Sequence, residues 1–153
     1  MSEELPFYKI HHIGAVVRDL EEAIEYYESL GIGPFEMFKL PGAITEQTMN
    51  GEHIDFQLRN AVARFGSVEF ELIQPVENAV LQEDFLESRG EGINHIGFKV
   101  DDFDKVSAEL EEKGFDVILY RYRSTGNKAA YFDTNKVGGV IVEIFQPAPA
   151  APE

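Results

Sequence analysis

Hydrophobic and polar positions along the chain alternate between a strand-like and a helix-like period. Residues 8–17 are rich in apolar and β-branched side chains, which predicts a strand. Over residues 20–30, apolar side chains recur at helical spacing with glutamates on the other side. Asp19 is a good N-cap before this stretch and Gly31 a good stop after it, so a helix is predicted between them.

Three further strands are predicted in the first half of the chain, at 34–40, 53–65 and 67–74. The last two are joined at Gly66 and form a predicted hairpin. The segment 41–52 holds two glycines and few apolar residues. We therefore interpret it as a loop and as a candidate lid.

The same order of elements begins again after a connector that carries a short predicted helix at 80–88. An offset of 83 positions (95 minus 12) places His95 on His12, and it also aligns both helix N-caps and both helix stops. Agreement over a strand, a cap, a helix and a stop indicates an internal repeat. The second half is predicted to contain strands at 93–100, 115–122, 129–133 and 140–145 and a helix between Asp102 and Gly114.

The repeat predicts an α+β fold of two βαβββ modules, whose eight strands form a curved sheet with flanking helices. Each module's sheet has an apolar face that it cannot bury alone, so both modules are expected to share one domain. The predicted boundaries are a tail at 1–6, a single domain at 7–147 and a disordered tail at 148–153, with module 1 at about 7–77, the connector at 78–91 and module 2 at about 92–147.

Each module opens on a His-Ile-Gly sequence and closes on a Glu-apolar-apolar-Gln-Pro sequence. The histidines are His12 and His95, and the glutamates are Glu71 and Glu143. Two neutral imidazoles and two carboxylates, brought together by the pseudo-twofold of the repeat, make a mixed nitrogen and oxygen site for one divalent metal ion. Ligand type alone allows Zn, Co, Ni, Mn or Fe(II).

Other interpretations of these residues stay open. A glutamate in an apolar strand such as 140–145 can also face outward on an edge or form a buried ion pair. The glycine two residues after each histidine leaves room for metal and substrate, or it permits a bulge or close helix packing. His11 points to the face opposite His12 and corresponds to Asn94 in the repeat, so His12 is the candidate ligand.

Composition and charge narrow the classes of function. The 153-residue chain has a formal net charge of −15 and no cysteine. An acidic surface repels nucleic acid and anionic membranes, so neither is expected as a partner. The lack of cysteine excludes disulfides, thiolate zinc sites and cysteine nucleophiles. The N-terminus does not read as a signal peptide and no apolar run reaches the roughly 20 residues of a membrane span, so a cytoplasmic protein is expected.

One basic cluster stands out in this acidic chain. Arg121 and Arg123 share a face of a predicted strand, and Lys128 follows. These three side chains are candidates for binding a substrate carboxylate or the phosphates of CoA. The alternative is a solvated strand end whose cations balance nearby acids.

The paired histidine openings and glutamate closings resemble the vicinal oxygen chelate superfamily. The sequence Gly-Gly-Val-Ile-Val-Glu at 138–143 is most similar to its glyoxalase I and methylmalonyl-CoA epimerase branch, and the resemblance covers about residues 8–147. It implies the glyoxalase/bleomycin resistance/dioxygenase fold and a homodimer. The metal ligands that it implies are His12, Glu71, His95 and Glu143.

The same resemblance implies a metal-dependent isomerase or lyase that removes a proton next to a carbonyl and stabilises the enolate on the metal. The expected substrate is a small molecule, an acyl-CoA or a hemithioacetal. The candidate base is Glu143, as a ligand that can dissociate, or else Glu52 or Glu46 from the predicted loop. Two other activities of the fold stay open: an Fe(II) extradiol-type dioxygenase, and a metal-free small-molecule binding or resistance protein.

Overall fold

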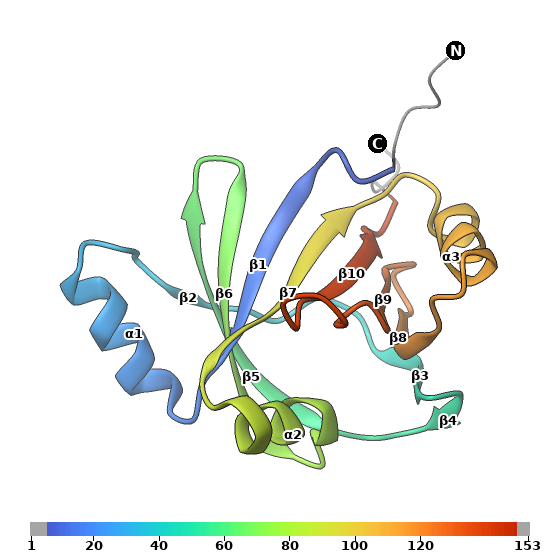
Figure 1. Cartoon of the computed structure of the whole chain (residues 1–153). Coiled ribbons are helices and arrows are strands. Elements are labelled where there is room, and N and C mark those ends of the chain that lie inside the picture. Colours follow the sequence, from blue (N-terminus) through green and yellow to red (C-terminus); the bar gives the residue numbers. More distant parts are fainter. Residues whose placement is uncertain (1–5, 150–153) are drawn as a thin grey trace. The chain divides into compact units, whose positions relative to one another are not determined.

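The structure is a computed structural model that describes residues 6–149, which form ten β-strands and three α-helices (Figure 1). The predicted α+β fold class is confirmed. The described residues fall into two compact units: the first unit contains residues 11–40 and 55–96, and the second contains 6–10, 41–54 and 97–149. Most of both predicted tails lies outside the described residues.

The first unit is a five-stranded arrangement with two helices. Its strand order is β2, β5, β6, β1 and β7, with β1 parallel to β6 and antiparallel β5 and β6 forming the predicted hairpin. Its elements are β1 (Ile10–Val16), α1 (Leu20–Ser29), β2 (Glu36–Met37), β5 (Gln57–Phe65), β6 (Val68–Glu77), α2 (Val80–Arg89) and the start of β7 (Gly92–Lys99).

The second unit contains one helix and continues from the end of β7. Its strand order is β7, β10, β9, β8, β3 and β4, and the pairs from β10 to β4 are antiparallel. Its further elements are β3 (Ile44–Met49), β4 (Glu52–His53), α3 (Phe103–Glu112), β8 (Val117–Arg123), β9 (Lys128–Phe132) and β10 (Ile141–Gln146).

The prediction of a loop over 41–52 is wrong, and this accounts for the two strands beyond the expected eight. The segment forms β3 and β4, and β3 pairs with β8 of the other sequence module. Gln47 is the only buried side chain in the segment, so hydrophobic alternation could not reveal the strand. Backbone hydrogen bonds to a distant partner strand hold it instead. The predicted strand at 53–65 correspondingly begins later, at Gln57.

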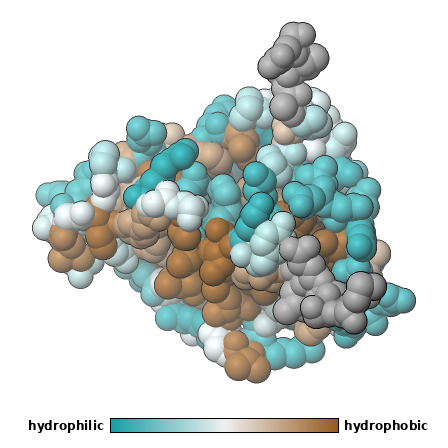
Figure 2. Space-filling view, turned by 90° about the horizontal axis from the view of Figure 1, so that it is seen from above, coloured by the Kyte–Doolittle hydropathy of each residue, from teal (hydrophilic) through white to brown (hydrophobic). Residues whose placement is uncertain are grey.

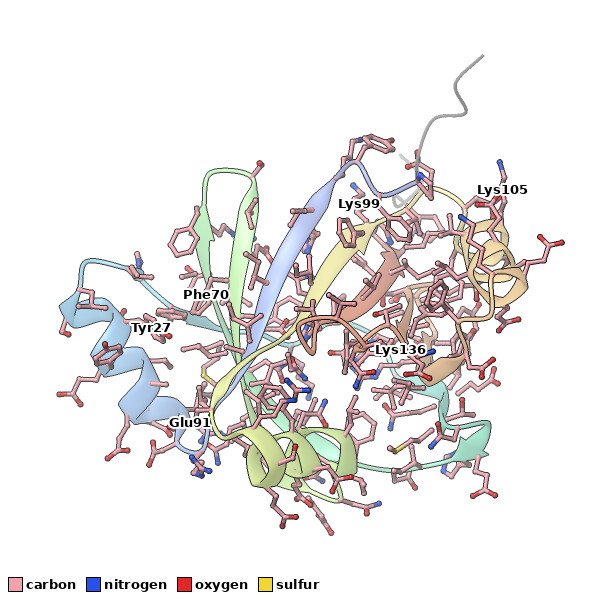
Figure 3. The ribbon with its side chains drawn as sticks, viewed as in Figure 1. Tyr27, Phe70, Glu91, Lys99, Lys105 and Lys136 are labelled. Atoms are coloured by element: carbon pink, nitrogen blue, oxygen red, sulfur yellow. The ribbon has the colours of Figure 1, made fainter. Side chains whose placement is uncertain are left out.

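Each unit has its own apolar core beside its repeated helix. In the first unit, Leu20 of α1 packs with Leu72 of β6 and with alanines of β1 and β5. Tyr27 of α1 and Phe70 of β6 meet edge to face with ring centroids 5.1 Å apart (Figure 3). In the second unit, the buried face of α3 packs on β9 and β10. The predicted apolar stripes therefore face the sheets, except at Leu30, which is 59% exposed, and they fix each helix on its sheet.

The helix starts were predicted correctly. The repeated glutamine of the closing motif adds a second hydrogen bond at each start. The Asp19 and Asp102 carboxylates accept the backbone N–H groups of Glu22 and Lys105 at 3.0 and 3.1 Å. The Gln74 side-chain oxygen accepts the N–H of Leu20, the first residue of α1, at 2.9 Å. The equivalent Gln146 oxygen accepts the N–H of Phe103, the first residue of α3, at 2.9 Å. The glutamine of each closing motif thus caps the helix of its own module.

Apolar residues also reach the surface. Figure 2 shows them as brown patches among teal hydrophilic residues. On and just after α1, Tyr26 and Leu30 are 61% and 59% exposed. Among the described residues, no helix combines the length and apolar character that a membrane crossing requires.

Candidate metal centre

The two repeated histidines meet inside the first unit. His12 comes from β1 and His95 from β7, and their Nε2 atoms lie 3.2 Å apart. Both rings are buried, with 6% and 0% exposure. Two imidazole nitrogens at this distance share a hydrogen, or both present lone pairs to a common cation. The internal repeat therefore brings its equivalent histidines to a single point.

Glu71 joins this pair from the neighbouring strand. Parallel pairing of β1 with β6 places Glu71 opposite Gly14, and its Oε1 lies 4.0 Å from Nε2 of His95. Its side chain is 13% exposed. Ligand atoms that each sit about 2.0–2.2 Å from one ion are separated from each other by roughly 3–4 Å. The separations of His95 Nε2 from His12 Nε2, 3.2 Å, and from Glu71 Oε1, 4.0 Å, both fall in this range.

Gly14 provides the space that the His95 ring occupies. A Cβ atom at this position would lie 2.0 Å from Cε1 and 2.5 Å from Nε2 of His95. No L side chain fits there without displacing the imidazole. The space at Gly14 is therefore filled by the His95 ring, which differs from both interpretations left open by the sequence: room for metal and substrate, or a bulge or close helix packing.

Two further residues contact the Nδ1 atoms of the histidine rings. The sequence did not predict them as part of the site. Nδ1 of His95 lies 2.7 Å from Oδ1 of Asn94, and Nδ1 of His12 lies 2.9 Å from Nδ1 of His11. Strand alternation pointed His11 away from the site. The repeat alignment did pair His11 with Asn94, and that was the available signal.

Glu143 belongs to the second unit. It lies in β10 opposite Tyr131 of β9, and it is 7% exposed between the buried strand neighbours Ile141 and Ile144. It is therefore a carboxylate on the inner side of an apolar strand, which excludes the outward-facing alternative.

The other two candidate bases also lie in the second unit. Glu46 is in β3 opposite Tyr122 of β8, and Glu52 is in β4 opposite Met49. Both side chains are exposed. They lie on paired strands, whereas a loop was expected.

The basic cluster makes specific contacts within the second unit. Arg121 donates from Nε to Oε1 of Gln47 at 2.8 Å, and Arg123 donates from Nη1 to the carbonyl of Gly42 at 3.0 Å. Burial, followed by the nearby charge of Arg121, lowers the pKa of Arg123 from its usual value. Lys128 pairs with Asp104 at 3.3 Å. Arg123 thus has a partner in the segment just before β3, and Lys128 has one in α3.

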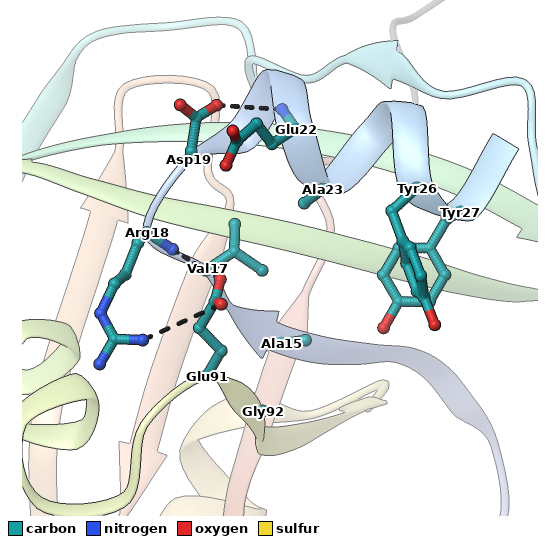
Figure 4. A pocket seen from close by; sticks show the side chains of 10 residues that line it. All are labelled: Ala15, Val17, Arg18, Asp19, Glu22, Ala23, Tyr26, Tyr27, Glu91 and Gly92. Atoms are coloured by element: carbon teal, nitrogen blue, oxygen red, sulfur yellow. Dashed lines mark hydrogen bonds and ion pairs between the residues drawn. The ribbon is translucent and has the colours of Figure 1, made fainter. Parts of the chain in front are cut away.

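A separate cavity of about 410 Å³ lies in the first unit between β1 and α1 (Figure 4). Ala15 and Val17 line it, and they point to the strand face opposite His12 and Gly14. At its edge, the backbone N–H of Arg18 donates to Glu91 at 3.0 Å. This cavity is therefore distinct from the histidine cluster.

The donor set of the first unit fits a divalent metal ion. Imidazole nitrogen and carboxylate oxygen suit Zn, Co, Ni, Mn and Fe(II). The histidine nitrogens converge, and a glycine clears the space for one ring. A lone pair directed at another lone pair is unfavourable, so a cation between the rings would relieve a repulsion.

Comparison with known proteins identifies relatives of this chain. Residues 11–132 match the model of the glyoxalase/bleomycin resistance protein/dioxygenase superfamily. The uncharacterized protein YqjC of Bacillus subtilis (strain 168) is 28% identical over 142 residues, which cover 91% of this chain and 92% of that protein.

Solved structures show the same fold. The methylmalonyl-CoA epimerase of Mycobacterium tuberculosis has a TM-score of 0.68 and 25% identity, over 97% of this chain and 94% of that one. The Streptomyces coelicolor methylmalonyl-CoA epimerase, in complex with 2-nitronate-propionyl-CoA, has a TM-score of 0.67 and 24% identity, over 94% and 99%. A hypothetical protein of Bacillus halodurans C-125 has a TM-score of 0.70 and 24% identity, over 95% and 98%.

Proposed function

Because this chain belongs to the glyoxalase/bleomycin resistance protein/dioxygenase superfamily, we propose that it is a metal-dependent isomerase that removes and returns a proton on the carbon next to a thioester carbonyl. The convergence of the His12 and His95 Nε2 atoms carries this proposal. Similarity to methylmalonyl-CoA epimerases, one of them in complex with methylmalonyl-CoA, supports an acyl-CoA substrate. A glyoxalase-type isomerisation of a hemithioacetal is the second candidate, and it needs the same residues.

The proposed ligands are His12, Glu71, His95 and Glu143. Glu143 repeats the position of Glu71 at the end of its module. An ionised carboxylate that is 7% exposed in an apolar strand is costly unless a cation or hydrogen bonds compensate it. Two carboxylates with two neutral imidazoles would leave a divalent ion electrically neutral, and an octahedral ion would keep two positions for substrate.

The chain's own residues have distinct tasks in the proposed reaction. When bound, the ion would act as a Lewis acid that stabilises negative charge on the carbonyl oxygen. We assign proton removal to Glu143 first, because burial shields its oxygens from competing water. Glu46 and Glu52 are second choices, since both are exposed. Arg121, Arg123 and Lys128 are proposed to hold the anionic end of the substrate, and a homodimer is proposed from the family resemblance.

Exchange of the α-proton in heavy water tests the chemistry. Protein loaded with Co(II) or Ni(II) and mixed with a 2-substituted acyl-CoA should incorporate deuterium at that carbon, as followed by NMR or mass spectrometry. His95→Ala should abolish the exchange. His53→Ala is the matched control, because His53 is an exposed histidine in β4 and should leave exchange unchanged.

Each outcome of this assay separates the competing activities. Exchange with a hemithioacetal alone would assign the glyoxalase-type reaction. Oxygen uptake with a catechol and Fe(II) would assign the dioxygenase. Stoichiometric metal without turnover of any of these substrates would refute the proposed isomerase. If the purified protein retains no metal, the proposed metal site would be refuted as well. The metal-free small-molecule binding protein would then be favoured.

A further inference from the structure

We propose that His11 and Asn94, the residues just before the two site histidines, are positioning residues that keep the Nδ1 proton on each ring and so direct both Nε2 lone pairs at the ion. This inference rests on the metal site of the proposed function. It assigns a role to two residues that neither the repeat motif nor the ligand set includes. All contacts that carry it lie within the first unit.

The contact between Asn94 and His95 defines one ring. Asn94 is fully buried, and its Oδ1 lies 2.7 Å from Nδ1 of His95. A side-chain amide oxygen only accepts hydrogen bonds, so the Nδ1 atom of His95 carries the proton. In a neutral imidazole the other nitrogen then has the free lone pair, and Nε2 is the atom that faces His12. Asn94 therefore selects the tautomer of His95 that is able to bind a metal through Nε2.

His11 acts in the same way on His12 through a different chemical group. Nδ1 of His11 lies 2.9 Å from Nδ1 of His12, so one of these nitrogens donates and the other accepts. Nε2 of His11 lies 3.9 Å from Oε2 of Glu69, a carboxylate that attracts a proton to that side of the ring. With its proton on Nε2, His11 accepts at Nδ1. His12 then donates from Nδ1 and presents the lone pair of Nε2.

The internal repeat strengthens this assignment. His11 and Asn94 are equivalent positions, as are His12 and His95, and the order of acceptor followed by ligand is the same in both strands. The two acceptors are chemically different, yet each contacts Nδ1 of the next residue. A role shared by equivalent positions explains these contacts better than two independent packing accidents. Residues that hold the second nitrogen of a metal-binding histidine fix its tautomer and ring orientation.

The first measurement needs no metal and no variant. Long-range ¹⁵N NMR at neutral pH distinguishes protonated from unprotonated imidazole nitrogens in the purified metal-free protein. His95 should carry its proton on Nδ1. A neutral His95 with its only proton on Nε2 would overturn the proposal, because Asn94 would then be donating its amide N–H to Nδ1. This result is independent of whether the protein is an isomerase.

The second measurement is the affinity for Zn(II), by competition with a chromogenic chelator. Asn94→Leu removes the acceptor and should weaken affinity about 10- to 100-fold, the usual loss for such partners. Asn94→Asp keeps an acceptor oxygen and should stay within a few-fold of the parent. His11→Leu should weaken affinity in the same way. His11→Asn installs the residue found at the equivalent position and should restore most of it.

Gln82→Leu is the matched control for a lost buried amide. Gln82 of α2 is 1% exposed, and neither of its side-chain polar atoms has a hydrogen-bond partner among the described residues. Its replacement should change neither the ¹⁵N pattern nor the Zn(II) affinity. Asn94→Leu with parental affinity and an unchanged His95 tautomer would refute the positioning role. If the parent protein binds Zn(II) but shows no α-proton exchange, that result would count only against the proposed function.

Discussion

At the scale of single residues, the site depends on close approach between a glycine and an imidazole. In the first copy of the repeated His-Ile-Gly motif, the histidine is a proposed ligand and the glycine leaves space for the histidine of the second copy. His12 supplies a nitrogen, and Gly14 leaves room for the ring of His95. Periodicity alone could show that the glycine shares a face with the histidine. It could not show whose side chain fills the gap.

Gly14→Ala should therefore damage the site strongly. The new methyl group would meet His95 at about 2 Å, so the ring or the strand must move, at a cost of about 1–3 kcal/mol in the free energy of unfolding. Metal affinity should fall along with stability, as measured by denaturant unfolding and chelator competition. Gly92→Ala is the control, since a Cβ there meets nothing within 4 Å. Equal effects of both changes would contradict this account.

The raised pKa of Tyr120 predicts that the free energy of unfolding falls at alkaline pH. Burial, and after it the carboxylate of Glu46, raises the pKa of Tyr120 above its usual value of 10.0. A pKa that is higher in the folded state gives stability that is complete below the unfolded pKa and is lost as pH rises through the folded pKa. Between pH 7 and about 11, the free energy of unfolding should fall more in the parent than in Tyr120→Phe. Parallel curves would show that Tyr120 does not contribute.

At the scale of elements, the closing motif serves two purposes. Its glutamates point to the site or to the inner side of a strand, and its glutamines point to the opposite face and cap a helix. Strand alternation separates the two, because they are three positions apart. The structure thus explains why glutamine is repeated as faithfully as glutamate.

Gln146→Ala should destabilise α3. It removes the acceptor of the Phe103 N–H, and a lost hydrogen bond of this kind costs about 1 kcal/mol. Asp102→Ala removes the N-cap acceptor of Lys105 and should cost about 0.5–2 kcal/mol. Urea unfolding followed by circular dichroism measures both. Asp101→Ala, at the exposed neighbouring aspartate, should change stability by less than about 0.5 kcal/mol, and an equal loss there would argue against capping.

The strand pair β3 and β4 yields a second prediction at this scale. Gln47 is 3% exposed, donates to the carbonyl of Ile54 at 3.0 Å and accepts from Arg121 at 2.8 Å. Gln47→Leu would leave both partners without this bond, at about 1–3 kcal/mol. In the Gln47→Leu variant, amide hydrogen exchange should also be faster in β3 than in β5. Thr48→Ala, one residue on and at a half-buried position, serves as the control.

At the scale of the whole molecule, metal binding should be coupled to stability. A ligand that binds only the folded state adds about 2.7 kcal/mol at one hundred times its dissociation constant. Addition of Zn(II) or Co(II) should therefore raise the unfolding temperature, and a chelator should reverse the effect. His12→Ala and His95→Ala should abolish the shift, and His53→Ala should keep it. A shift that survives in both site variants would place the metal elsewhere.

The sequence by itself determined the superfamily, the α+β class, the repeat, and the caps and stops of the two repeated helices. These features are local: a period of two or of 3.6, a carboxylate before a helix and a glycine after it act within a few residues. The repeat extended them over the chain and marked both histidines and Glu71. The structure brings His12 and Glu71 close to His95, and the ligand roles of these three residues and of Glu143 stay predictions.

Only the tertiary structure decided which distant segments pair. Strands β3 and β4 bury almost no side chain, so their hydrogen bonds to β8 leave no hydrophobic signature in the sequence. The grouping of 41–54 with the second half follows from that pairing. The contacts of His11 and Asn94 behind the histidine rings likewise depend on side-chain directions that a two-residue period only approximates. Strand pairing and ring orientation depend on partners far away in the chain, so a local sequence pattern cannot predict them.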